Sequence, residues 1–489
     1  MKVTSTFRRS DGSKERGITM VLVAAAMVAI IGIAAMSIDL VTLYLAREEA
    51  QRAADAAALA AARIISVSGI TGTANPTSDP ADWSSICGPE NPGWATQTAM
   101  AVAAQNSVGG QAVTVNVTYS DGGAPTNDCS TLSAKFAVNP MVTVQVVPTA
   151  IPSFFSRIWA RTGNNISATA TAEAFNPSSS NTNGITTSGN VTPVQPRCVK
   201  PWIVPNIDPG NCPGGSCGKF VSTANGTIQN AKIAPAGVIG ESFYLFADCA
   251  LGNATSCSVP DLQPIANAPP SGGYYGGAPA PTHTPNLEYL PGAVPSTFQA
   301  VPSCAPASDY GSAVAGCDTT TVYQCGQTLA ALTNPNTLDL RENPAGSSGD
   351  TAQALACSLT GNSNPGNIPL VGNDTLRTTS YPFVAIAGSA NPLGLGGGTT
   401  SVPITASNSI VSLPIYDGAT LPPPTTTNTP PVAIVGFLQV FVNDVKSDGS
   451  IFVTVLNVAG CGSNASVNPP VFGSSPVPVR LITPLPPSQ

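Results

Sequence analysis

Apolar residues form one long, unbroken run near the start of the chain. The run ITMVLVAAAMVAIIGIAAMSI, residues 18–38, contains 21 residues and no charge. A helix of this length is about 30 Å long, which is the thickness of the hydrocarbon core of a bilayer. The pattern therefore predicts a transmembrane helix. A cleaved secretory signal is the alternative, although its apolar region is usually only about 7–15 residues long.

The residues that follow, 39–65, favour a continuation of the same helix. They read DLVTLYLAREEAQRAADAAALAAARII, contain neither Gly nor Pro, and place Glu48 four residues before Arg52. Strong helix formers and ion pairs of this orientation both stabilise helices. We therefore expect one helix over about 17–65. Its alanine-rich second half, like the small residues of the apolar run, allows close packing against another helix. An isolated anchor is the alternative.

Beyond the helix, residues 66–176 predict a small α+β domain. Residues 94–107 have a helical composition, and three segments alternate between apolar and polar positions as half-buried strands do: 112–119, 140–147 and 166–175. Residues 151–163, IPSFFSRIWARTG, fit a short helix with one apolar face. That face either packs on the sheet or touches the membrane surface.

The rest of the chain changes in character. Residues 177–195 are rich in Ser, Thr, Asn and Pro, which is typical of a linker. Residues 196–489 predict a β-rich, disulfide-stapled domain with long loops. Its clearest elements are two β-branched runs within 432–458, which predict a hairpin. A Pro-rich tail follows at 464–489. The expected fold class is thus α+β.

Charge adds a direction to the predicted span. Five basic residues precede the apolar run, in an arm over 1–17, and the first charge after the run is Asp39. The positive-inside rule places residues 1–17 in the cytoplasm and the bulk of the chain outside it. We therefore expect a single-pass protein of the inner (cytoplasmic) membrane. No other basic cluster appears, so nucleic acid is not an expected partner.

Cysteines support an extracytoplasmic location. Only 9% of residues are charged, and all twelve cysteines follow the apolar run. An even number of cysteines in an exported chain predicts up to six disulfides in an oxidising compartment. Because Cys87 and Cys129 are alone in 66–176, we expect them to pair. The remaining cysteines are Cys198, Cys212, Cys217, Cys249, Cys257, Cys304, Cys317, Cys325, Cys357 and Cys461.

Enzymatic chemistry finds little support in the sequence. Residues 214–218 match the nucleophile-elbow pattern G-x-S-x-G, but a Pro- and Gly-rich loop precedes them, and the single histidine, His283, lies in APAPTHTPN. A zinc site is disfavoured because paired C-x2-C units are absent. Asp448-Gly449 fits a plain hairpin turn better than a calcium loop. We expect no enzyme activity, no metal and no cofactor.

Polar residues before and after the apolar run stand at positions that are characteristic of one protein family. These positions identify the segment. It resembles the N-terminal module of TadE/TadG-like Flp pilus-assembly proteins over about 48 residues. The residues that carry this resemblance, which are also the candidate helix-packing residues, are Arg16, Gly17, Asp39, Tyr44, Arg47, Gln51, Ala54, Asp55 and Leu59.

The resemblance implies a role in a tight-adherence pilus and secretion system. It implies partners among pilus-assembly or pilin-like proteins, reached through the helix, and an oligomer is compatible with it. The domain at 66–176 then resembles a pilin-like domain. Leu22 stands where pilins have glutamate, so prepilin cleavage is not expected. Residues 82–86 break the von Willebrand A metal motif, so that domain is not expected either.

Two functional hypotheses follow. The first is a non-enzymatic, membrane-anchored scaffold or minor subunit of an Flp/Tad-type pilus-assembly system. The second is a surface adhesin or carbohydrate-binding protein that uses the same anchor. Exposed aromatic residues after residue 196 would favour the second, and the candidates are Trp202, Tyr274, Tyr275, Tyr289 and Tyr310.

Overall fold

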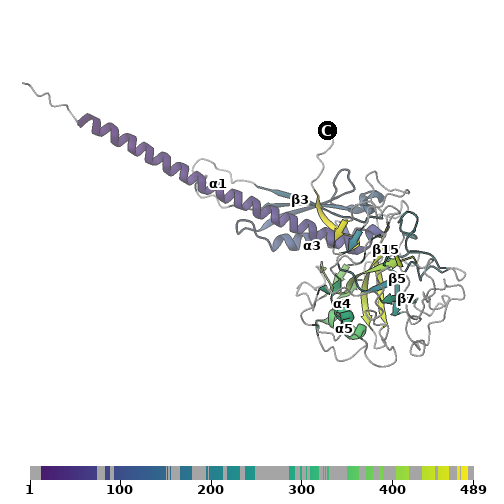
Figure 1. The fold of residues 1–489 in the computed structure, drawn as a ribbon. Helices are drawn as coiled ribbons and strands as arrows, with labels where there is room; N and C mark the ends of the chain where they lie inside the picture. Colours follow the sequence, from purple (N-terminus) through teal and green to yellow (C-terminus); the bar gives the residue numbers. More distant parts are fainter. Residues whose placement is uncertain are drawn as a thin grey trace, which may run out of the picture. The chain divides into compact units, whose positions relative to one another are not determined.

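A single helix dominates the N-terminal part of the computed structural model. Helix α1, Ser13–Ser68, runs for 56 residues without a break, which confirms the single helix expected over 17–65 (Figure 1). Gly69 follows it with a φ of 94°, a left-handed conformation that commonly ends helices because glycine adopts it without strain. A short 3-10 turn, η1, Ile70–Thr73, comes next.

The structure describes part of the chain. The described residues are 13–73, 83–88, 93–149, 151, 155, 166–178, 194–196, 198–212, 217–231, 237–247, 286–291, 298–299, 304, 309–318, 323, 325, 328–329, 350–362, 370–377, 385–388, 403–417, 432–445, 450–461, 471–473 and 475–482. The expected linker over 177–195 lies almost wholly outside them.

Two compact units can be distinguished. The first unit comprises Met1–Ala54, Ala103–Asn116 and Gln145–Thr169, and the second comprises Asp55–Val102, Val117–Val144 and Ala170–Gln489. The division falls within α1 and within three strands of one sheet. That sheet has the order β1-β2-β3-β18, with bounds Val113–Ser120, Met141–Pro148, Ala168–Ala174 and Val479–Ile482.

Alternating apolar residues explain this four-stranded sheet. In β2, Val142, Val144 and Val146 are buried while their neighbours are half-buried, as the two-residue period of a strand requires. Strand β18 pairs antiparallel with β3 and lies within the residues expected to form a Pro-rich tail. Its short run VRLI has enough β-branched and apolar character to extend the sheet despite the surrounding prolines.

Six strands of the second unit form a closed ring. They are β5, Trp202–Pro205; β6, Ser242–Ala247; β7, Asn286–Pro291; β14, Ile410–Tyr416; β15, Val432–Val445; and β16, Ile451–Gly460. The pairings run β15-β14-β5-β7-β6-β16 and return to β15, so each strand has two neighbours. Closing a sheet in this way removes its edges. The hairpin expected at 432–458 is β15 and β16.

The interior of this barrel is the main core of the second unit. Trp202, Phe243 and Tyr289 are buried there together with Leu413 and Leu438. Two helices, α4, Asp309–Ala315, and α5, Asp350–Thr360, lie next to each other (Figure 1). They add apolar side chains to the same cluster. The shorter elements are α2, Ser84–Cys87; α3, Trp94–Ala104; η3, Cys129–Thr131; η4, Ala134–Ala137; β4, Val194–Pro196; β8, Phe298–Gln299; β9, Cys317–Asp318; β10, Thr328–Leu329; β11, Leu370–Val371; β12, Thr375–Arg377; β13, Ala385–Ala387; and β17, Val471–Gly473.

Disulfides connect segments that are distant in the sequence. Cys87 pairs with Cys129, as expected, and this bond lies beside the buried rings of Trp83 and Phe136. The other described bonds are Cys198–Cys317, Cys212–Cys217, Cys304–Cys357 and Cys325–Cys461. Cys249 and Cys257 lie outside the described residues. The twelve cysteines thus include ten that are oxidised in pairs, which is typical of an exported protein.

Replacing Cys87 and Cys129 with alanine should loosen the segment that this bond closes. The bond joins residues 42 apart, and the loss of a cross-link of this span lowers the free energy of unfolding by about 2–4 kcal/mol. Amide exchange over residues 83–88 measures the change. The matched control removes Cys212 and Cys217, which are only five residues apart, and should leave exchange at 83–88 unaltered. Equal effects of the two variants would contradict the prediction.

Candidate functional site on the N-terminal helix

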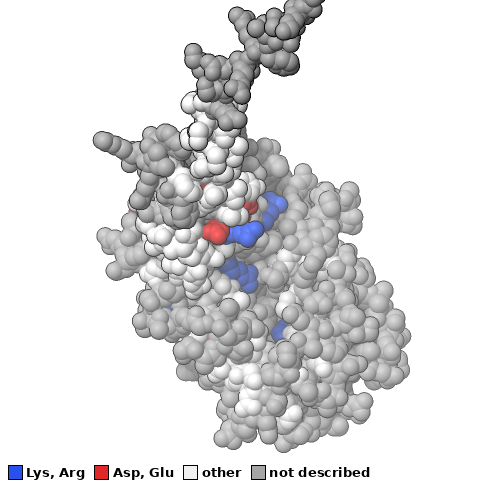
Figure 2. Space-filling view, turned by 90° about the vertical axis from the view of Figure 1, so that its left-hand side faces the viewer, with Lys and Arg blue, Asp and Glu red and all other residues white. Residues whose placement is uncertain are grey.

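The first half of α1 carries nearly all the exposed large apolar side chains of the described surface. Of the 18 such residues in the described part of the chain, 16 lie between Ile18 and Leu45. Figure 2 shows α1 emerging as uncharged surface, with charged side chains only near its base. A continuous apolar surface of this size marks a membrane or protein contact. Among the described residues, α1 is the one helix long and apolar enough to cross a membrane, which is consistent with a single-pass anchor.

The second half of α1 has a different surface. Its alanines are buried at spacings of three and four residues, the period of one helix face: Ala46, Ala50, Ala53, Ala54, Ala57, Ala58, Ala61 and Ala62. Small side chains allow the backbone of the helix to be approached closely. The chain itself occupies this space, so the alanine face expected to receive a partner helix is already covered. The exposed surface of α1 is therefore mainly that of its apolar first half.

Asp39 lies at the change from the first half to the second. It directly follows the uncharged run, yet its residue is only 6% exposed. The carboxylate Oδ2 accepts a hydrogen bond of 3.0 Å from the backbone N–H of Phe155. Burial of a carboxylate is unfavourable unless its oxygens are hydrogen-bonded. Asp39 therefore holds residue 155 against the helix within the first unit.

Two further polar side chains of α1 hold backbone groups of the first unit. Gln51 Nε2 donates to the carbonyl oxygen of Thr169 at 3.3 Å. Glu49, which was not among the candidate residues, accepts a hydrogen bond of 2.7 Å from the N–H of Gly109 through Oε2. Two of the polar candidate residues, Asp39 and Gln51, thus serve attachment within the chain. The sequence feature that indicates such attachments is a polar side chain within an alanine-rich helix, because buried polar groups need hydrogen-bond partners.

The remaining candidate residues are distributed around the helix. Gly17, Tyr44 and Arg47 are exposed, Ala54 is buried, and Asp55 and Leu59 are half-buried. The side chain of Arg16 lies outside the described residues. The structure therefore does not collect these residues into one cluster, and it places them along successive turns of one helix.

The end of α1 is joined to the barrel by a buried amide network. Asn457 of β16 accepts from the hydroxyl of Thr71 at 3.0 Å and donates to the carbonyl of Ser66 and to Gln439 Oε1. Both amide side chains are completely buried. Asn176 adds hydrogen bonds to the carbonyls of Thr71 and of residue 458. This network was not predicted from the sequence. The sequence feature that indicates it is Asn457, an amide within an otherwise apolar strand.

Arg63 contributes to the same attachment. Its guanidinium donates through Nε to the carbonyl of Thr405 at 3.3 Å and through a terminal nitrogen to Ser475 Oγ at 3.2 Å. Burial lowers the pKa of Arg63 to about 10, so it is still protonated at neutral pH. Val67 packs beside it in a small core cluster with Ile404 and Phe441. Polar and apolar contacts thus both fix the last turns of α1 in the second unit.

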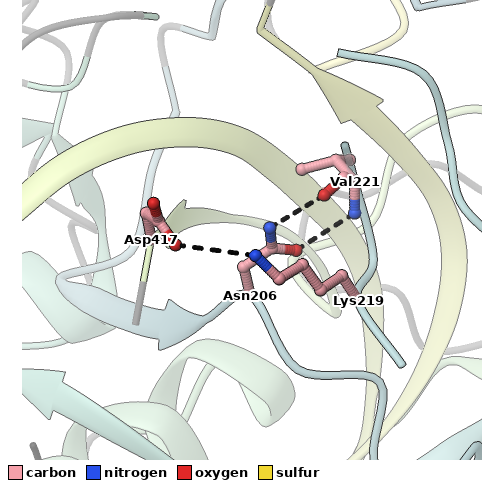
Figure 3. A network of polar contacts seen from close by, with 4 residues as sticks. All are labelled: Asn206, Lys219, Val221 and Asp417. Carbon is pink, nitrogen blue, oxygen red and sulfur yellow. Dashed lines mark hydrogen bonds and ion pairs between the residues drawn. The ribbon is translucent and has the colours of Figure 1, made fainter. Parts of the chain in front are cut away.

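Polar groups around the barrel are largely structural. Asn206 follows β5, and its side chain accepts from the N–H of Val221 at 3.0 Å and donates to its carbonyl at 2.8 Å (Figure 3). Lys219 lies 4.0 Å from Asp417 across the same region. A partly exposed ion pair of this length contributes little to stability. The bidentate amide is the stronger contact because Asn206 is buried.

Glu241 and Lys200, which lie just before β6 and β5, are buried and have shifted pKa values. Burial, together with the neighbouring Asp208, raises the pKa of Glu241 well above the ordinary 4.5. Burial lowers the pKa of Lys200 to about 7. Its ammonium donates to the carbonyl oxygens of Val314 and Gly316, which lie at the end of α4. A cation at this helix end is favourable, so Lys200 holds the end of α4.

The other sequence candidates give no assembled site in the described residues. No group of three or more His, Cys, Asp or Glu side chains lies together in the part of the chain that the structure describes. Residues 214–216 of the G-x-S-x-G match, His283 and Asp448-Gly449 lie outside it, as do the side chains of Tyr274, Tyr275 and Tyr310. Trp202 and Tyr289 are fully buried in the barrel and cannot stack on a sugar, which corrects their assignment as exposed aromatics.

Comparison with known protein families gives a match to the helix described above. Residues 17–63 match the family model of the Tad domain, described as TadE/G-like and involved in Flp pilus assembly. The match ends at Arg63, at the turn where α1 enters the buried network. No curated protein and no solved structure matches the chain.

Replacing Asn457 with alanine should loosen the attachment of α1. The change leaves Thr71, Ser66 and Gln439 without their shared partner, and a few unpaired buried groups lower stability by about 2–3 kcal/mol. Amide exchange over residues 64–73, in the full chain, measures the loss. Asn116 is exposed on β1, so Asn116→Ala is the matched control. Faster exchange in both variants, or in neither, would count against the network.

Glu241 and its neighbour Asp208 predict that the stability of the fold depends on pH. Because the folded pKa of Glu241 is raised above its unfolded value, the folded state binds the proton more tightly. Its contribution to stability is complete below about pH 4.5 and is lost as the pH rises. Glu241→Gln cannot ionise, so its melting temperature relative to wild type should increase with pH. Lys200 acts in both proteins and cancels in this difference. Glu48→Gln, at an exposed position, should show no such trend; a pH-independent difference for Glu241→Gln would refute the shift.

Proposed function

We propose that this chain is a membrane-anchored, non-enzymatic component of an Flp/Tad-type pilus-assembly and secretion system. In this role it acts outside the cytoplasmic membrane as a scaffold or minor subunit. The observation that carries the proposal is the coincidence of two features in α1. The helix matches the Tad domain over residues 17–63, and its first half exposes 16 large apolar side chains.

Two independent features support an extracytoplasmic body. Basic residues precede the apolar run, which favours a cytoplasmic N-terminus in the inner membrane. The described cysteines are joined in five disulfides, all of them after the helix. Disulfides persist in oxidising compartments and are rare in the cytoplasm. Charge and oxidation state therefore favour the same orientation.

The apolar half of α1 is the surface that supports a helix-mediated partnership. A side chain added at Gly32 would meet nothing within 4 Å, so the backbone is open there. Ala24, Ala25 and Ala26 provide further small positions on the exposed helix. Transmembrane helices associate through such small residues. Membrane helices of other pilus-assembly or pilin-like proteins are the partners we propose for this surface.

The barrel supports a structural role for the body. Its aromatic residues Trp202 and Tyr289 belong to the hydrophobic core. A closed ring of strands also offers few unpaired backbone groups to other chains. We therefore assign the body to positioning and contact, with no catalytic step.

A charge in the middle of the span tests the proposal in the host. With the chromosomal copy deleted, wild type and Ile30→Leu should restore Flp pili and surface attachment. Ile30→Arg should restore neither, because a central arginine makes insertion less favourable by about 2.5–3.5 kcal/mol. Membrane fractionation verifies the loss of the anchor. Normal piliation in the deletion strain, or with the soluble Ile30→Arg chain, would contradict the proposed function.

A further inference from the structure

The apolar exposed surface of α1 is longer than a bilayer core requires. Exposed large apolar side chains begin at Ile18 and continue to Leu45. These 28 residues extend over about 42 Å, whereas the hydrocarbon core is about 30 Å thick and the bilayer with headgroups about 40–45 Å. The extra length lies at the C-terminal end of this apolar surface, over residues 39–45. Leu40, Val41, Tyr44 and Leu45 therefore reach the level of the headgroups.

At this level the helix has two unlike sides. One side presents Leu40, Val41 and Tyr44, each more than half exposed. The other side is covered by the chain, since Asp39 and Ala46 are buried. The first exposed charges beyond this extra length are Arg47, Glu48 and Glu49, which mark the level where the surface turns to water. Tyrosine is a residue that favours the membrane–water interface.

The backbone of Phe155 is held beside Asp39, the residue that directly precedes this exposed face. Its N–H donates to Asp39 Oδ2 at 3.0 Å, and Asp39 is the residue directly after the 21-residue uncharged run. Ala35, one turn earlier, is also buried, so this side of α1 is covered from the last turn of the span onward. The residue whose backbone is bonded to Asp39 is aromatic.

We propose that Phe155 and the exposed face of residues 40–45 form a second membrane contact, which rests in the headgroup layer and positions the first unit on the bilayer. This inference rests on the proposed span of α1. Asp39 is the positioning residue, because its carboxylate holds the backbone of residue 155 beside the end of the span. The occupant is the phospholipid of the same bilayer, since the exposed face continues the lipid-facing surface of the helix without interruption.

Photo-crosslinking to lipid tests the contact. Benzoylphenylalanine is placed singly at Ile30, Tyr44, Phe155 or Leu481 in the full chain, in nanodiscs of phosphatidylcholine and phosphatidylglycerol. We expect covalent phospholipid at Ile30, Tyr44 and Phe155, and none at Leu481, an exposed apolar residue elsewhere on the chain. Capture at Ile30 without capture at Phe155 overturns the second contact and leaves the proposed span intact. No capture at Ile30 overturns the span itself.

The role of Asp39 is tested on the same probe. Asp39→Ala removes the acceptor, and loss of a charged hydrogen bond corresponds to about a tenfold change in population. Lipid capture at Phe155 should fall by about that factor while capture at Ile30 is unchanged. Asp39→Asn keeps an acceptor oxygen and should restore part of the yield. Unchanged capture at Phe155 in Asp39→Ala, with Ile30 capture retained, would show that Asp39 does not position it.

Discussion

The rest of this structure depends on the continuity of one helix, α1, whose two halves have different surfaces. A backbone in the hydrocarbon core must satisfy its hydrogen bonds internally, which restricts the span to a helix. The same helix continues past residue 45, where its alanines are buried by the chain. The change of surroundings is matched by a change of side chains, from large apolar to small. Asp39 lies at that change and joins the helix to the backbone of residue 155.

The attachment of the helix to the barrel follows from the same continuity. A helix that stopped at the membrane surface would hold the body only by a flexible segment. Here the last turns carry Arg63 and Ser66 into hydrogen bonds with residues more than 300 positions away. These bonds are buried, so they are strong and specific in geometry. These contacts therefore fix the last turns of α1 to the barrel within the second unit.

The sequence predicted those elements that depend on residues close together in the chain. The span follows from an uncharged run, the hairpin from two β-branched runs, and the bond between Cys87 and Cys129 from their isolation in one segment. Closure of the barrel was not predictable in this way, because β5 pairs with β14 across some two hundred residues. The same long-range pairing buries Trp202 and Tyr289, which composition alone had suggested as exposed. Asn457 is likewise meaningful only once Ser66 lies beside it.

The central claim is that α1 is one uninterrupted helix that belongs to both membrane and body. Hydrogen–deuterium exchange of the full chain in nanodiscs measures this directly, amide by amide. The account predicts slow exchange from Ile18 through Ile65, with no rapid segment between Asp39 and Ala46. A stretch of fast exchange there would show that the anchor and the body are joined by a flexible link, and it would contradict the account.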